Sequence, residues 1–201
     1  MRKRSKRRIG KLFIVSAPSG AGKTTLCKAI AKITPDIKHS VSYTTRPPRK
    51  GEINNVHYTF VSEKKFKAMI DKDEFAEWAV VYGNLYGTSM KRLKEITKKG
   101  YDIILDIDTH GAVQMRRKFK GAVFIFVLPP SLQVLKQRLT ARMSEPAKEL
   151  KKRINRIKEE IACCKNYDYV IINDKLKKAI KELEGIVIAE RLRIKNKVCR
   201  I

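Results

Sequence analysis

Residues 17–24 read Ala-Pro-Ser-Gly-Ala-Gly-Lys-Thr and combine two glycines with a lysine and a hydroxyl side chain. Gly20 and Gly22 allow backbone N–H groups to point at phosphate oxygens, and the helix expected to follow directs its positive end to the same place. We expect Lys23 to reach the β and γ phosphates of a nucleoside triphosphate, and the Thr24 hydroxyl to contact Mg²⁺. The first residue of the stretch is alanine, where this loop pattern usually has glycine. The pattern predicts nucleoside triphosphate binding and leaves the reaction open.

A second group of phosphate-binding side chains follows in residues 40–52, Ser-Val-Ser-Tyr-Thr-Thr-Arg-Pro-Pro-Arg-Lys-Gly-Glu. Arg46 and Arg49 flank two prolines on a predicted turn, and each guanidinium can make paired hydrogen bonds to phosphate oxygens. Tyr58 and Tyr86 add hydroxyl groups. The alternative is that both arginines are solvated loop charges, but the preceding phosphate loop favours a clamp on the phosphate of an acceptor.

Apolar runs predict the strands that position these side chains. Near-continuous apolar runs are typical of buried parallel strands; the expected strands are 12–15, 101–107, 122–128 and 169–172. Leu26, Ile30 and Ile33 recur at helical spacing after the phosphate loop. A strand before and a helix after the loop argue against a glycine-rich turn that binds nothing. The alternation predicts an α/β fold with a parallel sheet flanked by helices.

Asp106 and Asp108 follow one of these runs, at the strand end where ligands of open α/β sheets bind. The alternative is a pair of carboxylates in a strand-end turn.

Thr88 and Ser131 are predicted helix N-caps, and Gly100 is predicted to end a helix.

Two segments interrupt the alternation. Residues 40–86 are expected to form an inserted lobe, with a helix from Ser62 to Ile70. Residues 140–152 are charged, contain Pro146, and are expected to form a mobile cover over a site.

Composition excludes several classes of protein. With 201 residues, 43% of them hydrophobic, the chain can bury a core as one domain and is not expected to be disordered. No apolar run approaches the roughly 20 residues of a membrane-spanning helix. The cysteines lack metal-like spacing and are expected to be reduced thiols in the cytoplasm; they are Cys27, Cys163, Cys164 and Cys199.

The net charge of +26 is concentrated partly at the two ends. Residues 1–11 and 191–201 carry seven and five basic residues and no acidic one. Such an excess is typical of proteins that bind nucleic acid, anionic membranes or phosphorylated small molecules. Weak, salt-dependent binding of nucleic acid by these tails is therefore a hypothesis.

Six motifs in this order resemble the guanylate kinase family; they occupy residues 16–24, 40–52, 77–79, 83–88, 105–108 and 170–174. The resemblance covers roughly residues 11–190 and implies the fold of a P-loop nucleoside monophosphate kinase. It implies a core at 11–38 and 88–190, a GMP-binding lobe at about 39–87 and a lid at about 138–153. Residues 1–10 and 191–201 are then basic extensions.

The implied reaction is phosphoryl transfer from ATP to GMP, and to dGMP, with Mg²⁺ as cofactor. The implied ATP-binding residues are Ala17, Pro18, Ser19, Gly20, Ala21, Gly22, Lys23, Thr24, Thr25, Asn173 and Asp174. The implied GMP-binding residues are Ser42, Arg46, Arg49, Tyr58, Glu77, Tyr86, Thr88, Asp106 and Asp108. The implied catalytic residues are Lys23, Arg138, Arg142 and Arg153, and the implied magnesium ligands are Thr24 and Asp106.

By the same resemblance, Glu77 accepts hydrogen bonds from the guanine N1–H and exocyclic amine, a donor pair that adenine lacks. The alternative is a surface carboxylate. A helix N-cap at Asn173 or Asp174 is compatible with a place beside the adenine. The lid has Met143 where the family frequently has glycine. A non-catalytic binding module of the same fold and a kinase for another nucleotide are the rival functions, and the chain is expected to be a monomer or a homodimer.

Overall fold

The computed structural model describes residues 8–81, 83–140, 157 and 159–193, with the backbone alone at 136 and 138–140. These residues fall into two compact units, one drawn from 1–12 and 36–122 and the other from 13–35 and 123–201. Arg142, Arg153, Met143 and most of the two basic tails lie outside the described residues.

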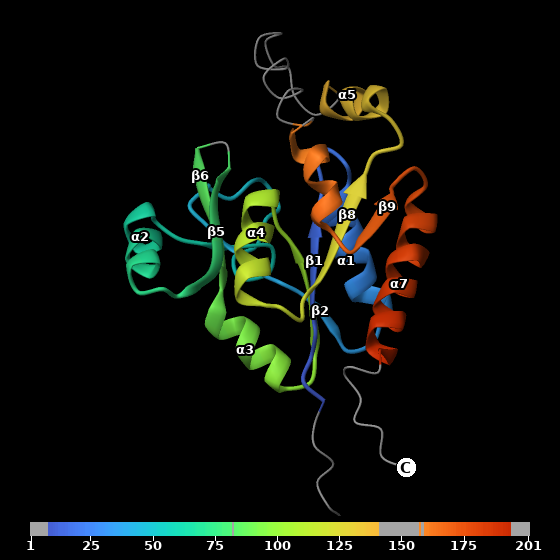
Figure 1. The fold of residues 1–201 in the computed structure, drawn as a ribbon. Coiled ribbons are helices and arrows are strands. Elements are labelled where there is room, and N and C mark those ends of the chain that lie inside the picture. Colours follow the sequence, from blue (N-terminus) through green and yellow to red (C-terminus); the bar gives the residue numbers. More distant parts are fainter. Residues whose placement is uncertain (1–7, 82, 141–156, 158, 194–201) are drawn as a thin grey trace, which may run out of the picture. The chain divides into compact units, whose positions relative to one another are not determined.

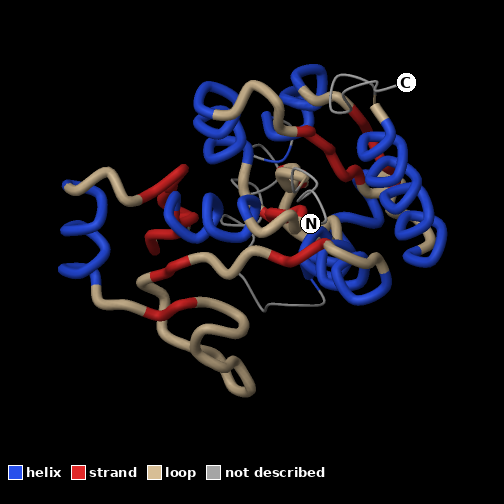
Figure 2. Tube along the Cα trace, turned by 90° about the horizontal axis from the view of Figure 1, so that it is seen from below, coloured by secondary structure: helices blue, strands red, loops and turns tan. Residues whose placement is uncertain are grey.

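The second unit contains three parallel strands in the order β1-β8-β9. They are β1 (Leu12–Ser16), β8 (Val123–Leu128) and β9 (Tyr169–Ile172). Its helices are α1 (Lys23–Ile33), α5 (Leu132–Thr140), the short 3-10 helix η1 (Cys163–Asn166) and α7 (Leu176–Leu192). Helix α7 packs against both α1 and β9 and runs beside β9 in Figure 1. Figure 2 shows the helices in blue and the strands in red.

The first unit contains a parallel pair, β2 (Ile37–His39) with β7 (Asp102–Asp106), and a second sheet in the order β4-β3-β6-β5. The strands of that sheet are β3 (Tyr43–Thr44), β4 (Thr59–Phe60), β5 (Phe75–Val81) and β6 (Asn84–Ser89). The helices of this unit are α2 (Glu63–Asp71), α3 (Met90–Lys98) and α4 (Thr109–Lys118). Helix α4 packs against β5, and α3 packs against β7 (Figure 1).

An aromatic cluster holds α2 on the second sheet. Phe66, Met69 and Phe75 are buried together, and the rings of Phe66 and Phe75 stack with their centroids 4.4 Å apart. A Cβ atom at Gly87 would lie 2.9 Å from atoms of both rings, so β6 needs glycine there. A register shift between Phe75 and Glu77 brings Glu77 opposite Thr88 of β6, as a bulge does when it redirects a side chain.

The predicted strands and the mixed α/β class are confirmed. The four apolar runs form β1, β7, β8 and β9. β1, β7 and β8 are largely buried because both faces of a parallel sheet are covered. The expectation of a buried strand is wrong for β9, an edge strand in which only Ile171 is buried. The helix predicted from Ser62 to Ile70 is α2, and Ser62 caps it by accepting from the Lys65 N–H at 3.3 Å.

One predicted cap is wrong. Ser89, and not Thr88, caps α3 and accepts from the Arg92 N–H at 3.3 Å. Strand β6 continues through both residues, and the Thr88 side chain is engaged elsewhere. The other two predictions are confirmed: Ser131 accepts from the Val134 N–H at 3.1 Å, and Gly100, at φ 91°, follows the end of α3.

No helix in the described part of the chain is long and apolar enough to span a membrane.

Candidate functional site

The phosphate loop connects β1 to α1 in the second unit. Its backbone takes the left-handed conformation at both Gly20 and Gly22, each at φ 88°, which favours glycine. The Ala21 N–H closes the turn onto the Pro18 carbonyl at 3.1 Å. Lys23 is the first residue of α1, so its side chain lies at the positive end of that helix. This is the backbone that a phosphate loop requires.

The other predicted loop residues differ in burial. Ala17, Pro18 and Ala21 are buried, whereas Ser19 is half-buried. Thr24 and Thr25 are exposed in the first turn of α1. A threonine hydroxyl is among the oxygen ligands that suit Mg²⁺.

Asn173, directly after β9, binds the backbone of the phosphate loop. Its side chain is buried, and Nδ2 donates to the Ala21 carbonyl at 2.8 Å. A Cβ atom at Gly22 would lie 2.5 Å from the same Nδ2. The alternative of an N-cap at Asn173 or Asp174 is wrong, because Lys175 is the N-cap residue of α7 and makes no side-chain cap.

The predicted lid arginines are not placed. Arg138 belongs to α5 by its backbone, but its side chain is among those left undescribed. Arg142 and Arg153 lie outside the described residues altogether.

The first unit brings Glu77 and Thr88 together on paired strands. The two residues are 4% and 1% exposed, and Thr88 Oγ1 donates to Glu77 Oε1 at 2.5 Å. Burying a carboxylate is costly unless it is hydrogen-bonded, so this is not the surface glutamate of the alternative interpretation. Ser42 is half-buried just before β3, where its carbonyl accepts from the Thr59 N–H at 2.8 Å.

Arg46 is held by a carboxylate that the sequence did not single out. Its Nη2 donates to both carboxylate oxygens of Glu52, at 2.8 and 2.9 Å, and Nη1 donates to the Pro47 carbonyl at 2.7 Å. The guanidinium also lies 5.5 Å from the Tyr58 ring centroid. Glu52 was part of the quoted motif, but spacing alone did not show that it reaches back six residues.

Tyr58 and Tyr86 lie beside this arginine, as predicted. Their rings meet edge to face with centroids 5.9 Å apart. Arg49 is exposed, and only its backbone joins the turn, with its N–H donating to Glu52 Oε2 at 2.7 Å. Arg46, Tyr58 and Tyr86 therefore form a polar cluster, with the Arg49 side chain directed to solvent.

These contacts shift three pKa values. Burial, then the nearby Asp106 carboxylate, raises the pKa of Tyr58 to about 12, so its hydroxyl stays protonated. Burial works to lower the pKa of Arg46, but its contacts with Glu52 and Tyr86 outweigh burial and raise it. The hydrogen bond from Arg46 lowers the pKa of Glu52 below its ordinary 4.5.

The Arg46–Glu52 pair predicts a pH-dependent contribution to stability. Because the pKa of Glu52 is lowered in the folded chain, its contribution is complete above the ordinary 4.5 and is lost as the pH falls through the lowered value. We expect Glu52→Gln to reduce the free energy of unfolding at pH 7 by up to about 1 kcal/mol. The deficit should shrink below pH 4 or so.

Denaturant unfolding over a pH series measures this deficit. Glu95→Gln, at an exposed glutamate of α3, is the matched control and should show no such trend. A deficit that is equally large at pH 3 and pH 7 would contradict the assignment.

Asp106 and Asp108 end up in different roles. Asp106 Oδ1 lies 2.8 Å from His39 Nε2, at the ends of the paired strands β7 and β2. His39 is not among the residues predicted for the site, because only the pairing of distant strands shows this contact. Asp108 is the N-cap of α4 and accepts from the Gly111 N–H at 2.7 Å. Asp108 therefore has a capping role, and its contact with GMP stays a prediction.

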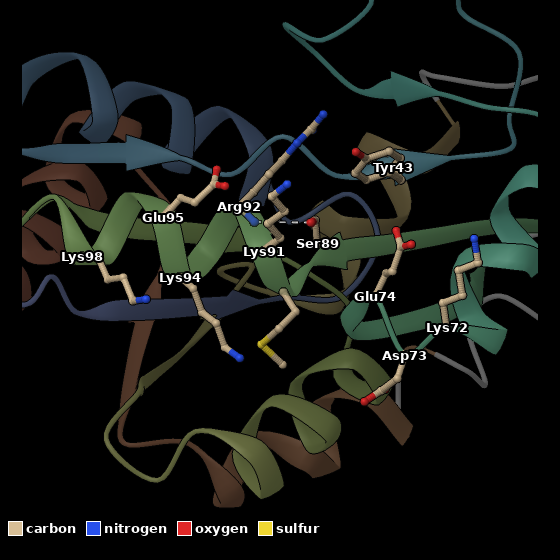
Figure 3. Close-up of a pocket in the computed structure, with 11 residues that line it drawn as sticks. Tyr43, Lys72, Asp73, Glu74, Ser89, Lys91, Arg92, Lys94, Glu95 and Lys98 are labelled. Atoms are coloured by element: carbon tan, nitrogen blue, oxygen red, sulfur yellow. Dashed lines mark hydrogen bonds between the residues drawn. The ribbon is translucent and has the colours of Figure 1, made fainter.

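A separate cavity of about 910 Å³ in the first unit contains none of the predicted site residues. Figure 3 shows its lining, which includes Lys91, Lys94 and Lys98 of α3 together with the acidic Glu74 and Glu95. Its mixed charges favour no single class of ligand. Among the described residues, no group of three or more His, Cys, Asp or Glu side chains could hold a metal ion by itself.

Known proteins resemble the chain over almost its full length. The sequence profile of the family described as guanylate kinase matches residues 9–190. Guanylate kinase of Geobacter sulfurreducens is 52% identical over 187 residues, covering 93% of this chain and 92% of that protein. Guanylate kinase of Geobacter metallireducens is 51% identical over 187 residues, which also cover 93% of this chain and 92% of that protein. The crystal structure of guanylate kinase from Anaplasma phagocytophilum matches with a TM-score of 0.74 and 31% identity, covering 92% of this chain and 88% of that chain.

Proposed function

The chain belongs to the guanylate kinase family, and we infer that it is a nucleoside monophosphate kinase that transfers the γ-phosphoryl group of ATP to GMP. We extend the proposal to dGMP, because no predicted contact distinguishes the two sugars. The observation that carries the choice of base is the buried Glu77 carboxylate, held by the Thr88 hydroxyl. The observation that carries the choice of reaction is the intact loop from Gly20 to Thr24.

Base recognition rests on hydrogen-bond donors. In our proposal the guanine N1–H and exocyclic amine donate to Glu77, with Ser42 and Thr88 beside the base. Adenine has no N1–H, so it would leave the buried carboxylate without its donors. Sites that bury a polar group in this way reject a ligand lacking its partner far more strongly than a hydrophobic pocket rejects a missing methylene group.

We propose that positively charged groups of the protein contact the phosphates of both nucleotides. Lys23 and the N–H groups of the loop contact the ATP phosphates. Arg46 and Arg49 contact the GMP phosphate, with Tyr58 and Tyr86 as hydroxyl partners. Arg46 is already oriented by Glu52, which leaves less side-chain entropy to lose on binding. Phosphoryl transfer needs little covalent chemistry from the protein, so these residues act by positioning and by neutralising charge.

The predicted magnesium ligands have the oxygen chemistry that this ion prefers. Mg²⁺ is usually held by one or two protein oxygens together with substrate phosphates and water, which fits Thr24 and Asp106. When bound, the ion supplies positive charge to the phosphate oxygens. His39 Nε2, 2.8 Å from Asp106 Oδ1, orients that carboxylate.

The remaining predicted residues are assigned to ATP. Asn173 and Asp174 are proposed to lie beside the adenine. Arg138, Arg142 and Arg153 are proposed to contact the phosphoryl group that is transferred.

A coupled assay with ATP and Mg²⁺ tests the function directly. GMP and dGMP should turn over, while AMP, CMP and UMP should be poorer by a factor of about 10⁴ in kcat/KM, since each leaves the carboxylate without its donor pair. Preferential turnover of AMP would overturn the proposal. The rival binding module would bind GMP without turnover, and the presence of Lys23 and Thr24 argues against it.

We propose the cytoplasm as the compartment, because Cys163 and Cys164 form no disulfide in the described residues. A monomer or homodimer is proposed. The basic tails receive no part in the reaction, and weak, salt-dependent binding of nucleic acid is proposed for them.

A further inference from the structure

We propose that Gly111 is a positioning residue for guanine specificity, because only glycine at this place in α4 leaves room for the Glu77 carboxylate. The inference rests on the proposed function, in which Glu77 reads the base. It adds a residue that touches neither nucleotide and acts through the position of Glu77 alone.

The distances at Gly111 carry the argument. A Cβ atom built on Gly111 would lie 2.4 Å from Glu77 Oε2 and 3.1 Å from Glu77 Cδ. Distances below 3.0 Å between such atoms do not persist, so one of the two side chains has to move. The same Cβ would lie 3.2 Å from Asp108 Oδ1, which is a tight contact. The Glu77 carboxylate therefore occupies the space that a side chain at residue 111 would fill.

The carboxylate is the part of the structure that can give way. It is the end of a flexible side chain, whereas Gly111 is fixed in α4 by its N–H donating to Asp108 Oδ1 at 2.7 Å. Helix α4 packs against β5, which carries Glu77 (Figure 1). A methyl group at residue 111 should rotate the carboxylate away and break its 2.5 Å bond from Thr88 Oγ1, while leaving the backbone in place.

Glycine is otherwise a poor choice at this position. Gly111 lies within the first turn of α4 and does not have a positive φ. Glycine destabilises a helix relative to alanine, since it loses more backbone freedom on folding. Helix propensity alone would therefore favour alanine, and the neighbouring carboxylate supplies a reason for glycine.

Gly111→Ala tests the inference, with Gly185→Ala as the matched control. Gly185 is also a helical glycine, in α7, but a Cβ atom there would meet nothing within 4 Å. We expect Gly185→Ala to melt at or above the temperature of the wild type, and Gly111→Ala to melt below it because the displaced carboxylate loses a buried hydrogen bond. Only Gly111→Ala should raise the KM for GMP, by about 10- to 100-fold, the range that losing a hydrogen bond to a charged group produces. The KM for ATP should not change.

A double-mutant cycle shows whether the effect passes through Glu77. In a Glu77→Ala background there is no carboxylate to displace, so adding Gly111→Ala should change the affinity for GMP by less than about twofold. Calorimetric titration with GMP alone gives this comparison without turnover.

The possible failures are distinct. A wild type that does not prefer GMP to AMP would contradict the proposed function. A wild type that prefers GMP, with Gly111→Ala retaining the wild-type KM, would overturn the inference alone. An equal loss of GMP affinity in both backgrounds would also overturn it.

Discussion

Replacing Lys23 by alanine should lower kcat for GMP phosphorylation by at least about 100-fold, the loss expected when a fixed group that stabilises transition-state charge is removed. Lys23 begins α1 directly after the left-handed Gly22, so the loop sets the position of its ammonium group. The loop backbone itself should persist in the variant. Its two glycines and the bond from Asn173 to the Ala21 carbonyl do not involve the lysine side chain.

The binding of GMP should change little in Lys23→Ala, because the residues proposed to hold GMP come from other elements. The coupled assay measures kcat, and calorimetric titration measures GMP affinity. Lys32→Ala is the matched control, since Lys32 is an exposed lysine in the last turn of the same helix. Lys23→Ala activity within a few-fold of the wild type would show that the loop does not act on the transferred phosphate.

The features that could be predicted from the sequence are those that local pattern determines. Strands β1 and β8 are buried along almost their whole length, so their sequences are apolar without alternation. The phosphate loop is contiguous, and its glycines are required by backbone conformation within the loop itself. Neither feature depends on which distant segment lies beside it.

The features that the sequence did not show depend on pairing between distant segments. His39 meets Asp106 only because β2 pairs with β7 in one register. Thr88 and Ser89 are both good cap residues, and the pairing of β6 with Glu77 of β5 decides which of them caps α3.

The need for glycine at residue 111 also could not be predicted from the sequence, because it depends on packing against a distant residue. Within α4 this glycine is an unfavourable helix residue, and nothing in its neighbouring sequence indicates why it is tolerated. The reason is an oxygen atom of Glu77, thirty-four positions earlier in the chain. Sequence spacing predicted the carboxylate, but not the space that the carboxylate needs.

Replacing Glu77 by glutamine should lower kcat/KM for GMP by about 10³- to 10⁴-fold, in line with sites that are built around a hydrogen-bonded substrate group. The amide keeps one oxygen to accept from guanine or from Thr88, but its NH₂ group faces a donor. Two donors directed at each other leave both unpaired in a buried place, which costs more than the loss of a single bond. Turnover of AMP should remain low, so the ratio of GMP to AMP turnover should collapse.

The fall in the ratio of GMP to AMP turnover distinguishes a role of Glu77 in base recognition from a role in folding. Glutamine has nearly the volume of glutamate, so the variant should retain the contact of β5 with α4 and unfold at a temperature close to that of the wild type. Glu63→Gln, on the exposed face of α2, makes the same chemical change where no base is expected and should leave the ratio unaltered. The ratio is measured by running the coupled assay with GMP and AMP on one preparation of each variant. If Glu77→Gln kept the wild-type ratio, the base would have to be read by Ser42 and Thr88, and the buried carboxylate would serve the fold instead.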